Sequence, residues 1–468
     1  MMSAFRKRIF RRKIYDELVR WKKEDSSRYA ILIEGVRRVG KSTVAKEFAA
    51  NKFRSYLLID FMEAPDTVKN MFNRFSDDPD RLFRLLSGYY NVRLYDRESL
   101  IIFDEVQEFP RAHQLVKYLV EYGKYPILET GSLITLKMHS KATLPSEVMT
   151  VPMNPMDFEE FMWACGKDAQ LDLIREAFHK REPMDESLHA DLMETFRTYM
   201  ITGGMPQSVS ALLETNSFQE VEKAKKLIID LYRNDIWREN DGILAELFDS
   251  IPSMLNRTSK TFSPGTVREG TKTERYSKRI SWLCGSRMVN PCYSCVNPDP
   301  AIRQFEDRSS LKMYFVDTGL LLTMMLEANI ANRDEIFGAI IKGELSMNRG
   351  MLFENMVAQT LVASGRNLDF CLFDSDESDR TQELDFILAD SGRIVPIEVK
   401  SSRIRPHKSL DRFMKKYSAE IDMGYIVSTK NLTEWPGIMN IPIYMAWLIR
   451  SHIRMRNPQP ADTPEAYR

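Results

Sequence analysis

The segment Gly35-Val36-Arg37-Arg38-Val39-Gly40-Lys41-Ser42 constrains the fold most strongly. It matches the G-x-x-x-x-G-K-[S/T] pattern of phosphate-binding loops (P-loops) at every defined position. An apolar run over residues 30–33 precedes the loop, and a helical pattern over residues 43–50 follows it. In that context the glycines let backbone N–H groups turn towards a phosphate, and the helix N-terminus adds partial positive charge. The loop therefore predicts a nucleotide site between a strand and a helix.

Three further apolar runs, residues 56–61, 100–103 and 126–128, alternate with helical stretches. Runs that are apolar throughout are typical of parallel strands, because helices cover both faces of a parallel sheet. The order of strands and helices therefore predicts an α/β domain, a P-loop NTPase core with a doubly wound parallel sheet.

The second half of the nucleotide site is expected where the run over residues 100–103 ends in Asp104 and Glu105. Lys41 would contact the β- and γ-phosphates of ATP, while Ser42 and Asp104 would hold Mg²⁺. Glu105 is placed to polarise the attacking water, so the pair predicts ATP hydrolysis. Thr130 is predicted as a polar sensor. The full set of predicted nucleotide contacts is Gly35, Arg37, Arg38, Val39, Gly40, Lys41, Ser42, Thr43, Asp104 and Thr130.

Composition limits the remaining possibilities. The chain has 468 residues, 66 of them basic and 66 acidic, so its formal net charge is zero. A neutral chain is not a globally basic coat for nucleic acid. At about 150 residues per domain, a chain of this length contains about three domains. The longest uncharged runs, residues 199–213 and 435–449, are shorter than the roughly 20 apolar residues that span a bilayer. We therefore expect a cytoplasmic protein without a membrane partner.

Periodicity and composition divide the chain into segments. We expect an N-terminal amphipathic helix within residues 1–23, the ATPase core over 24–165 and a helical lid over 166–245. Residues 246–325 have the helix–helix–strand order of a winged helix, residues 326–449 form a last α/β domain, and 450–468 form a tail. The basic residues of 257–279, among them Arg268, Lys272, Arg275 and Lys278, leave DNA contact and protein docking both open.

The last domain carries a second candidate site. Asp385, Glu398 and Lys400 have the spacing of a PD-(D/E)xK nuclease core. Glu398 and Lys400 alternate along one predicted strand and face the same side, and a turn at residues 390–392 brings Asp385 alongside. The carboxylates of Asp385 and Glu398 would share Mg²⁺, and Lys400 would orient the attacking water. Glu354, on the preceding helix, is the expected fourth member.

Two interpretations of this second site stay open. The first is a metal-dependent nuclease whose catalytic residues are Glu354, Asp385, Glu398 and Lys400. The second is a domain of the same fold that binds DNA or protein without cleaving it, in a regulatory or scaffold protein gated by nucleotide.

Several motifs together resemble the prokaryotic ATPases of the AAA superfamily that carry a C-terminal domain of unknown function. They are the P-loop, Asp104-Glu105-Val106-Gln107, Thr130-Gly131-Ser132, residues 155–161, Gly203-Gly204-Met205-Pro206, residues 231–236 and residues 316–321. The resemblance covers about residues 5–448 and implies a restriction-endonuclease-like α/β fold in the last domain. From the basic segment over residues 257–279 we expect DNA as the partner, with a homo-oligomer or a protein partner as the alternatives.

The chain departs from this family at one position. Many relatives carry a Gly-Arg pair where this chain has Pro145-Ser146-Glu147. An arginine sensor is therefore not assigned there, and Arg37 and Arg38 are the other candidate sources of positive charge.

Overall fold

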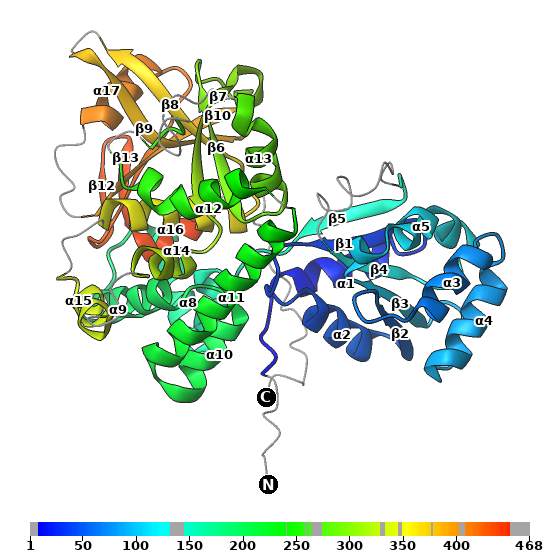
Figure 1. Cartoon of the computed structure of the whole chain (residues 1–468). Helices are drawn as coiled ribbons and strands as arrows, with labels where there is room; N and C mark the ends of the chain where they lie inside the picture. Colours follow the sequence, from blue (N-terminus) through cyan, green and yellow to red (C-terminus); the bar gives the residue numbers. More distant parts are fainter. Residues whose placement is uncertain are drawn as a thin grey trace. The chain divides into compact units, whose positions relative to one another are not determined.

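The computed structural model describes residues 8–131, 145–239, 241–257, 260–263, 274–327, 333–344, 349–375, 378–401 and 408–449. The chain separates into two compact units, shown in Figure 1. Unit 1 comprises Met1–Asn154 and Ser281–Met288, and unit 2 comprises Pro155–Ile280 and Val289–Arg468. Each unit is described by itself.

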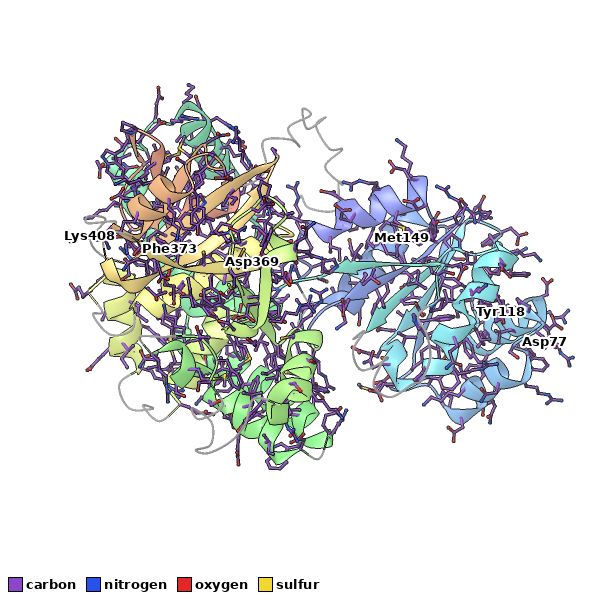
Figure 2. All side chains as sticks on the ribbon, turned by 90° about the horizontal axis from the view of Figure 1, so that it is seen from above. Asp77, Tyr118, Met149, Asp369, Phe373 and Lys408 are labelled. Carbon is purple, nitrogen blue, oxygen red and sulfur yellow. The ribbon has the colours of Figure 1, made fainter. Side chains whose placement is uncertain are left out.

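Unit 1 contains a five-stranded parallel sheet with the order β2-β3-β4-β1-β5. The strands are β1 Ala30–Glu34, β2 Ser55–Asp60, β3 Ser99–Asp104, β4 Ile127–Gly131 and β5 Val148–Pro152. The four predicted strands are confirmed. The edge strand β5 was not predicted, because its residues lack a continuous apolar run. Most of them are exposed, among them Met149, which is labelled in Figure 2. Since β4 lies between β1 and β3, the end of β4 lies between the P-loop and Asp104.

Helices cover both faces of this sheet. On one face lie α1 Ile14–Glu24 and α2 Lys41–Lys52, where Phe48 of α2 contacts Tyr15 and Trp21 of α1. The other face is covered by α3 Asp66–Arg74, α4 Pro79–Tyr90 and α5 Pro110–Tyr122. There Ile101 and Phe103 join a buried apolar cluster that includes residues of all three helices. The doubly wound α/β prediction is therefore confirmed.

Unit 2 contains an eight-stranded mixed sheet with the order β12-β13-β11-β10-β9-β8-β6-β7. Its strands are β6 Val289–Cys295, β7 Glu306–Phe315, β8 Leu368–Ser375, β9 Ser378–Asp390, β10 Arg393–Lys400, β11 Gly424–Ser428, β12 Thr433–Trp435 and β13 Ile438–Pro442. The predicted hairpin is present as β9 and β10. Its turn uses Ser391 and Gly392, both with positive φ, of 52° and 76°.

The other helices are α7 Phe158–Ala164, α8 Asp168–Lys180, α9 Glu186–Thr202, α10 Pro206–Thr215, α11 Phe218–Arg238, α12 Gly242–Leu255, α13 Glu274–Gly285, α14 Thr318–Met325, α15 Arg333–Lys342, α16 Arg349–Ala363 and α17 Lys408–Lys416. Within the described part of the chain, no helix is long and apolar enough to cross a bilayer.

The region predicted as a winged helix has the expected order of α12, α13, β6 and β7. Its hairpin is an integral part of the large sheet, because β6 pairs with β7 on one side and with β8 on the other. The winged helix and the sequence-based domain boundaries stay predictions.

Two of the motifs interlock inside unit 2. The N–H of Gly204 donates to Oδ2 of Asp317 at 2.6 Å, and the N–H of Leu320 donates to Oδ1 at 2.9 Å. Gly203 has φ 76°, and a Cβ there would lie 2.3 Å from Asp317 Oδ1. A Cβ on Gly319 would lie 2.5 Å from the Gly203 nitrogen. The corner between α9 and α10 therefore requires glycine where it meets the start of α14.

Candidate functional site

The P-loop connects β1 to α2 and has the tight backbone that its glycines predict. Gly40, directly before α2, has φ 103°, a conformation that side chains disfavour. A Cβ on Gly35 would lie 2.3 Å from the carbonyl oxygen of Met153, so that position excludes a side chain. The Nζ of Lys41 donates to the carbonyls of Gly35 at 3.0 Å and Val36 at 3.2 Å. These bonds hold a buried ammonium group against the loop that would cradle the phosphates.

The predicted Mg²⁺ residues lie together. Ser42 Oγ donates to Oδ1 of Asp104 at 2.7 Å, and the Thr130 hydroxyl donates to the same carboxylate oxygen. The Thr130 oxygen also accepts the backbone N–H of Glu105 at 3.1 Å. Thr130 thus connects Asp104 to Glu105 from the neighbouring strand.

The pKa shifts of Lys41 and Asp104 show that burial disfavours the charged form of both side chains, which an ionic ligand would stabilise. Burial lowers the pKa of Lys41, although the nearby Glu105 and Asp104 charges oppose the shift. Burial also raises the pKa of Asp104, against the hydrogen bonds from Thr130 and Ser42. Mg²⁺ beside Asp104 and phosphates beside Lys41 would each stabilise the charged form of the side chain. Oxygen donors and a cationic loop are the groups that Mg²⁺-ATP requires, so these residues fit it.

Glu105 occupies the turn that follows β3. Its backbone is left-handed, with φ 52° and ψ 49°, which is uncommon for a residue other than glycine. The side-chain amide of Gln107 donates to Glu105 Oε2 at 2.6 Å, so the half-buried carboxylate is held in a defined position. Strained residues of this kind cluster at functional sites.

The structure distinguishes the two arginines of the P-loop. Arg37 is half-buried, and its charge contributes to the lowered pKa of Lys41, whereas Arg38 is exposed with φ 68°. Sequence reasoning missed Arg12, whose guanidinium donates to the carbonyls of Val39 at 2.9 Å and Asn154 at 2.6 Å. Arg12 lies in a basic segment in which no pattern distinguishes it from its neighbours.

The second candidate site lies in the sheet of unit 2. Ile397 pairs with Phe386 in the antiparallel register of β9 and β10, so Asp385 and Glu398 are the next residues of this ladder. Asp385 Oδ2 accepts the backbone N–H of Val399 at 2.7 Å, and Lys400 binds Glu398 Oε1. The other oxygen of Glu398, Oε2, is buried without a hydrogen-bond partner. The structure therefore brings the three predicted motif residues together.

Two lysines outside the predicted motif also enter this site. Glu354 of α16 binds the ammonium group of Lys260 and the hydroxyl of Tyr314. Lys312 of β7 lies 3.6 Å from Glu354 and 2.6 Å from Glu383. Sequence reasoning placed Lys260 in the basic segment proposed for DNA contact and missed Lys312. The signal for Lys312 is a single lysine inside the apolar run of residues 311–315, since a buried ammonium needs a carboxylate partner.

The acids and lysines of this second site, called the carboxylate cluster below, compensate one another's charges. Burial raises the pKa of Asp385 well above its usual value, and the neighbouring Glu354 and Glu398 charges add to the shift. Burial also acts to raise the pKa of Glu354, but the Lys312 and Lys260 charges outweigh it and leave that pKa lowered. The remaining acids Glu354, Glu383 and Glu398 face Lys260, Lys312 and Lys400.

This arrangement does not fit a divalent cation. Lysine ammonium groups supply the positive charge that Mg²⁺ would bring, and they occupy both oxygens of Glu354 together with Tyr314. Among the described residues, no group of three or more histidine, cysteine, aspartate or glutamate side chains is placed to hold a metal ion. The predicted metal ligands Asp385 and Glu398 are adjacent, but they do not form a metal site in this arrangement.

The predicted DNA-contacting segment is described only in part. Lys260 and Arg279 are engaged within the protein, by Glu354 and by Asp241 respectively, with 2.9 Å between Arg279 Nε and Asp241 Oδ2. Lys278 is exposed. Arg268, Lys272 and the side chain of Arg275 lie outside the described residues.

Family models match three parts of the chain. Residues 27–162 match an AAA domain. Residues 193–332 and 349–445 each match a domain of unknown function, DUF8612 and DUF4143. None of the curated proteins matches the chain.

Three solved structures show a distant likeness to this chain. The Drosophila ORC bound to DNA is 14% identical with a TM-score of 0.27, over 68% of this chain and 96% of that one. A signal transduction ATPase with numerous domains (STAND) and a tetratricopeptide repeat sensor, from Pyrococcus horikoshii, is 12% identical with a TM-score of 0.29, over 77% of this chain and 50% of that one. C. elegans PCH-2 is 13% identical with a TM-score of 0.21, over 48% and 66%. At these TM-scores the likenesses carry no argument about function.

Proposed function

We propose that this chain, whose residues 27–162 are an AAA-family ATPase domain, hydrolyses ATP and thereby controls a C-terminal region that binds DNA without cutting it. The observation that carries the ATPase half is the 2.7 Å hydrogen bond between Ser42 and Asp104. It joins the P-loop to the acidic end of β3, the two parts that ATP hydrolysis needs side by side.

The residues have separate roles in this proposal. Lys41 binds the β- and γ-phosphates, while Ser42 and Asp104 hold Mg²⁺. The bound Mg²⁺ supplies positive charge for the phosphates of ATP. Glu105 accepts the proton of the attacking water, and the Thr130 hydroxyl keeps Asp104 and the Glu105 backbone in register.

Phosphate release by the full chain tests the ATPase half. We expect hydrolysis that requires Mg²⁺ and is lost in Asp104→Asn, because an amide holds the ion poorly. Glu108→Gln is the matched control, since Glu108 is an exposed acid of the same turn and should keep wild-type turnover. Equal turnover in Asp104→Asn and wild type would refute the assignment.

Lysines in the carboxylate cluster support binding without cleavage. A PD-(D/E)xK nuclease needs its acids free to hold a metal ion, whereas here Glu354 is neutralised by Lys260 and Lys312. The adjacency of Asp385, Glu398 and Lys400 and the unpartnered Oε2 atom of Glu398 favour the competing nuclease proposal.

An incubation with nucleic acid separates these two proposals. Supercoiled, linear and single-stranded DNA, and RNA, are incubated with the full chain and Mg²⁺ or Mn²⁺, with and without ATP. We expect all substrates to stay intact. Cleavage that disappears in Asp385→Ala and in Glu398→Ala would establish the nuclease instead, and ATP hydrolysis by those variants would show that they are folded.

DNA is the partner we propose because of the basic segment 257–279, in which Arg257 and Lys278 are exposed. Fluorescence anisotropy of a labelled duplex, with and without ATP, measures the interaction. Affinity that decreases with salt and changes with ATP is the expected result. No measurable DNA binding under either condition would favour a protein partner.

A further inference from the structure

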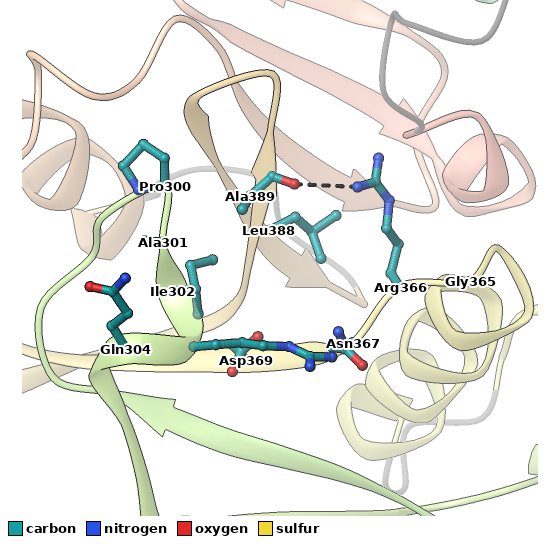
Figure 3. A pocket seen from close by; sticks show the side chains of 11 residues that line it. Pro300, Ala301, Ile302, Gln304, Gly365, Arg366, Asn367, Asp369, Leu388 and Ala389 are labelled. Carbon is teal, nitrogen blue, oxygen red and sulfur yellow. Dashed lines mark hydrogen bonds between the residues drawn. The ribbon is translucent and has the colours of Figure 1, made fainter. Parts of the chain in front are cut away.

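A cleft of about 420 Å³ lies in unit 2 (Figure 3), and its lining does not include Glu354, Asp385, Glu398 or Lys400. It is bounded by the 3-10 helix η3 Ile302–Phe305, the end of α16, and residues of β8 and β9. Its apolar lining includes Ile302 and Leu388, both buried, with Pro300 and Ala389. Its volume falls in the usual range of small-molecule sites, roughly 300–1,000 Å³.

Asp369 is the unusual residue of this lining. It lies on β8 between Tyr293 of β6 and Ile387 of β9, beside an irregularity in the β8–β9 ladder. Figure 2 labels it within unit 2, with Phe373 farther along the same strand. Asp369 is only 5% exposed, yet its Oδ1 atom has no hydrogen-bond partner. A buried acceptor without a hydrogen bond is unfavourable, and a ligand in the cleft would supply the missing donor.

The two arginines that line the cleft, Arg303 and Arg366, differ in their contacts with the rest of the protein. Arg366 donates to the carbonyl of Ala389 at 3.3 Å, drawn in Figure 3, and lies 3.9 Å from Asp390. Arg303 is exposed, and among the described residues no acidic group forms an ion pair with it. It is therefore available to an anion.

The charges around Asp369 also bear on whether a ligand donor binds there. Burial raises the pKa of Asp369 to about 7, with Glu306 of β7 adding to the shift and Arg303 opposing it. Glu306 is itself paired with Arg308 at 3.3 Å. The thiols of Cys292 and Cys295 on β6 also lie near enough to interact with Asp369 electrostatically. A donor bound at Asp369 would favour the ionised carboxylate.

These groups together define a ligand class. The carboxylate of Asp369, whose Oδ1 atom has no hydrogen-bond donor, matches a molecule with N–H donors, and Arg303 matches an anionic group on the same molecule. A purely cationic ligand is disfavoured because Arg303 and Arg366 both line the cleft. Among the common nucleobases, guanine presents two neighbouring N–H donors on one edge, whereas adenine presents a donor beside an acceptor.

We propose that this cleft binds a guanine mononucleotide, with the N–H edge of the base on Asp369, the ring between the apolar walls, and the phosphate towards Arg303. The proposal is independent of the ATPase assignment, because all of these residues belong to unit 2. A monophosphate also lacks the β- and γ-phosphates that the P-loop lysine would bind.

Calorimetric titration of the full chain with guanosine 5′-monophosphate tests the proposal, in a Lys41→Ala background that suppresses P-loop binding. We expect saturable binding, weakened about tenfold or more in Asp369→Asn, and adenosine 5′-monophosphate to bind about tenfold or more weakly. Arg303→Ala should weaken the monophosphate but leave guanosine unchanged. Asp374→Asn, an exposed acid of the same strand, is the matched control and should bind as the background protein does.

Three results would overturn the proposal: no binding at about 1 mM guanosine monophosphate, equal binding of the adenine and guanine nucleotides, or full affinity in Asp369→Asn. A melting curve of each variant checks folding. If Asp369→Asn does not fold, Arg303→Ala becomes the deciding variant. Undiminished binding of guanosine monophosphate by Arg303→Ala would also overturn the proposal.

Discussion

Lys312 Nζ lies 2.6 Å from Glu383 Oε1, and the lysine side chain is completely buried. Lys312 also approaches Glu354, so one ammonium group serves two carboxylates from different elements, α16 and β9. A divalent cation often has that role in proteins. In this sheet the polypeptide provides the cation itself.

Replacing this lysine should be costly. Lys312→Met keeps the apolar stem but leaves Glu354 and Glu383 without their shared cation, so we expect unfolding in urea to become easier by about 3–5 kcal/mol. Glu354→Gln in the same chain should recover part of that loss, because it removes one of the stranded charges. Lys408→Met, at an exposed position of α17, is the control. A stability of Lys312→Met within about 0.5 kcal/mol of wild type would contradict the buried-pair interpretation.

Glu105→Gln should separate ATP binding from hydrolysis. Glutamine keeps the size and hydrogen bonding of Glu105 but cannot accept the proton, so turnover should fall by about 10²–10⁴ while bound ATP persists. Lys41→Ala is the comparison, because it removes the ammonium group and should lose nucleotide binding itself. Rapid filtration of radiolabelled ATP and a phosphate-release assay measure the two effects. Wild-type turnover in Glu105→Gln would show that another group acts as the base.

Basic residues of the predicted winged helix should control the salt dependence of DNA binding. If Arg268, Lys272, Arg275 and Lys278 bind phosphates, changing all four to alanine should flatten the log–log salt slope by about 0.9 for each phosphate that is no longer neutralised. Anisotropy titrations at several salt concentrations give this slope. Changing Lys23, Arg84, Arg111 and Lys117, which are exposed in unit 1, is the matched control. An identical slope in the first variant would place the DNA site elsewhere.

Asp369→Asn should stabilise the protein increasingly as pH rises. The native pKa of Asp369, about 7, exceeds its ordinary value of 3.8. Below about pH 4 both the native and unfolded states are protonated, so burial carries no charge penalty. Between pH 4 and pH 7 Asp369 loses its proton in the unfolded state but keeps it in the native state. The free energy of unfolding therefore falls by up to about 4 kcal/mol, and the full loss is reached above pH 7. Asparagine avoids this loss.

Melting temperatures between pH 4 and pH 8 measure this effect. The gap between Asp369→Asn and wild type should be widest at pH 8 and close towards pH 4. Asp374→Asn should show no such trend, because Asp374 is exposed. A gap that is constant with pH would show that Asp369 is ionised in neither state or equally in both.

Local patterns sufficed for the nucleotide site. Ser42 lies inside a contiguous motif and Asp104 ends a continuous apolar run, so parallel strand order alone brings the two together. The hairpin with Asp385 and Glu398 was predictable for the same reason, since a short turn sets its register.

Contacts between distant segments were not predictable from such patterns. The pairing of Cys292 with Leu368 joins β6 to β8 although the two residues are 76 positions apart in the sequence, and neither strand indicates its partner. Lys260 and Lys312 reach Glu354 only because tertiary packing brings them there. Asp369 reads as an ordinary polar residue in sequence, and its burial depends on η3 and β9.

The contact between Gly204 and Asp317 has a practical consequence for dissecting the molecule. A fragment ending near residue 245, chosen to isolate an ATPase with its helical lid, would strip the α9–α10 corner of its capping carboxylate and expose the glycine backbone that accommodates it. Conversely, a C-terminal fragment beginning near residue 326 would lack Asp317 and the hairpin strand that pairs with β8. A recombinant fragment intended to fold on its own should therefore contain residues 155–449 without interruption.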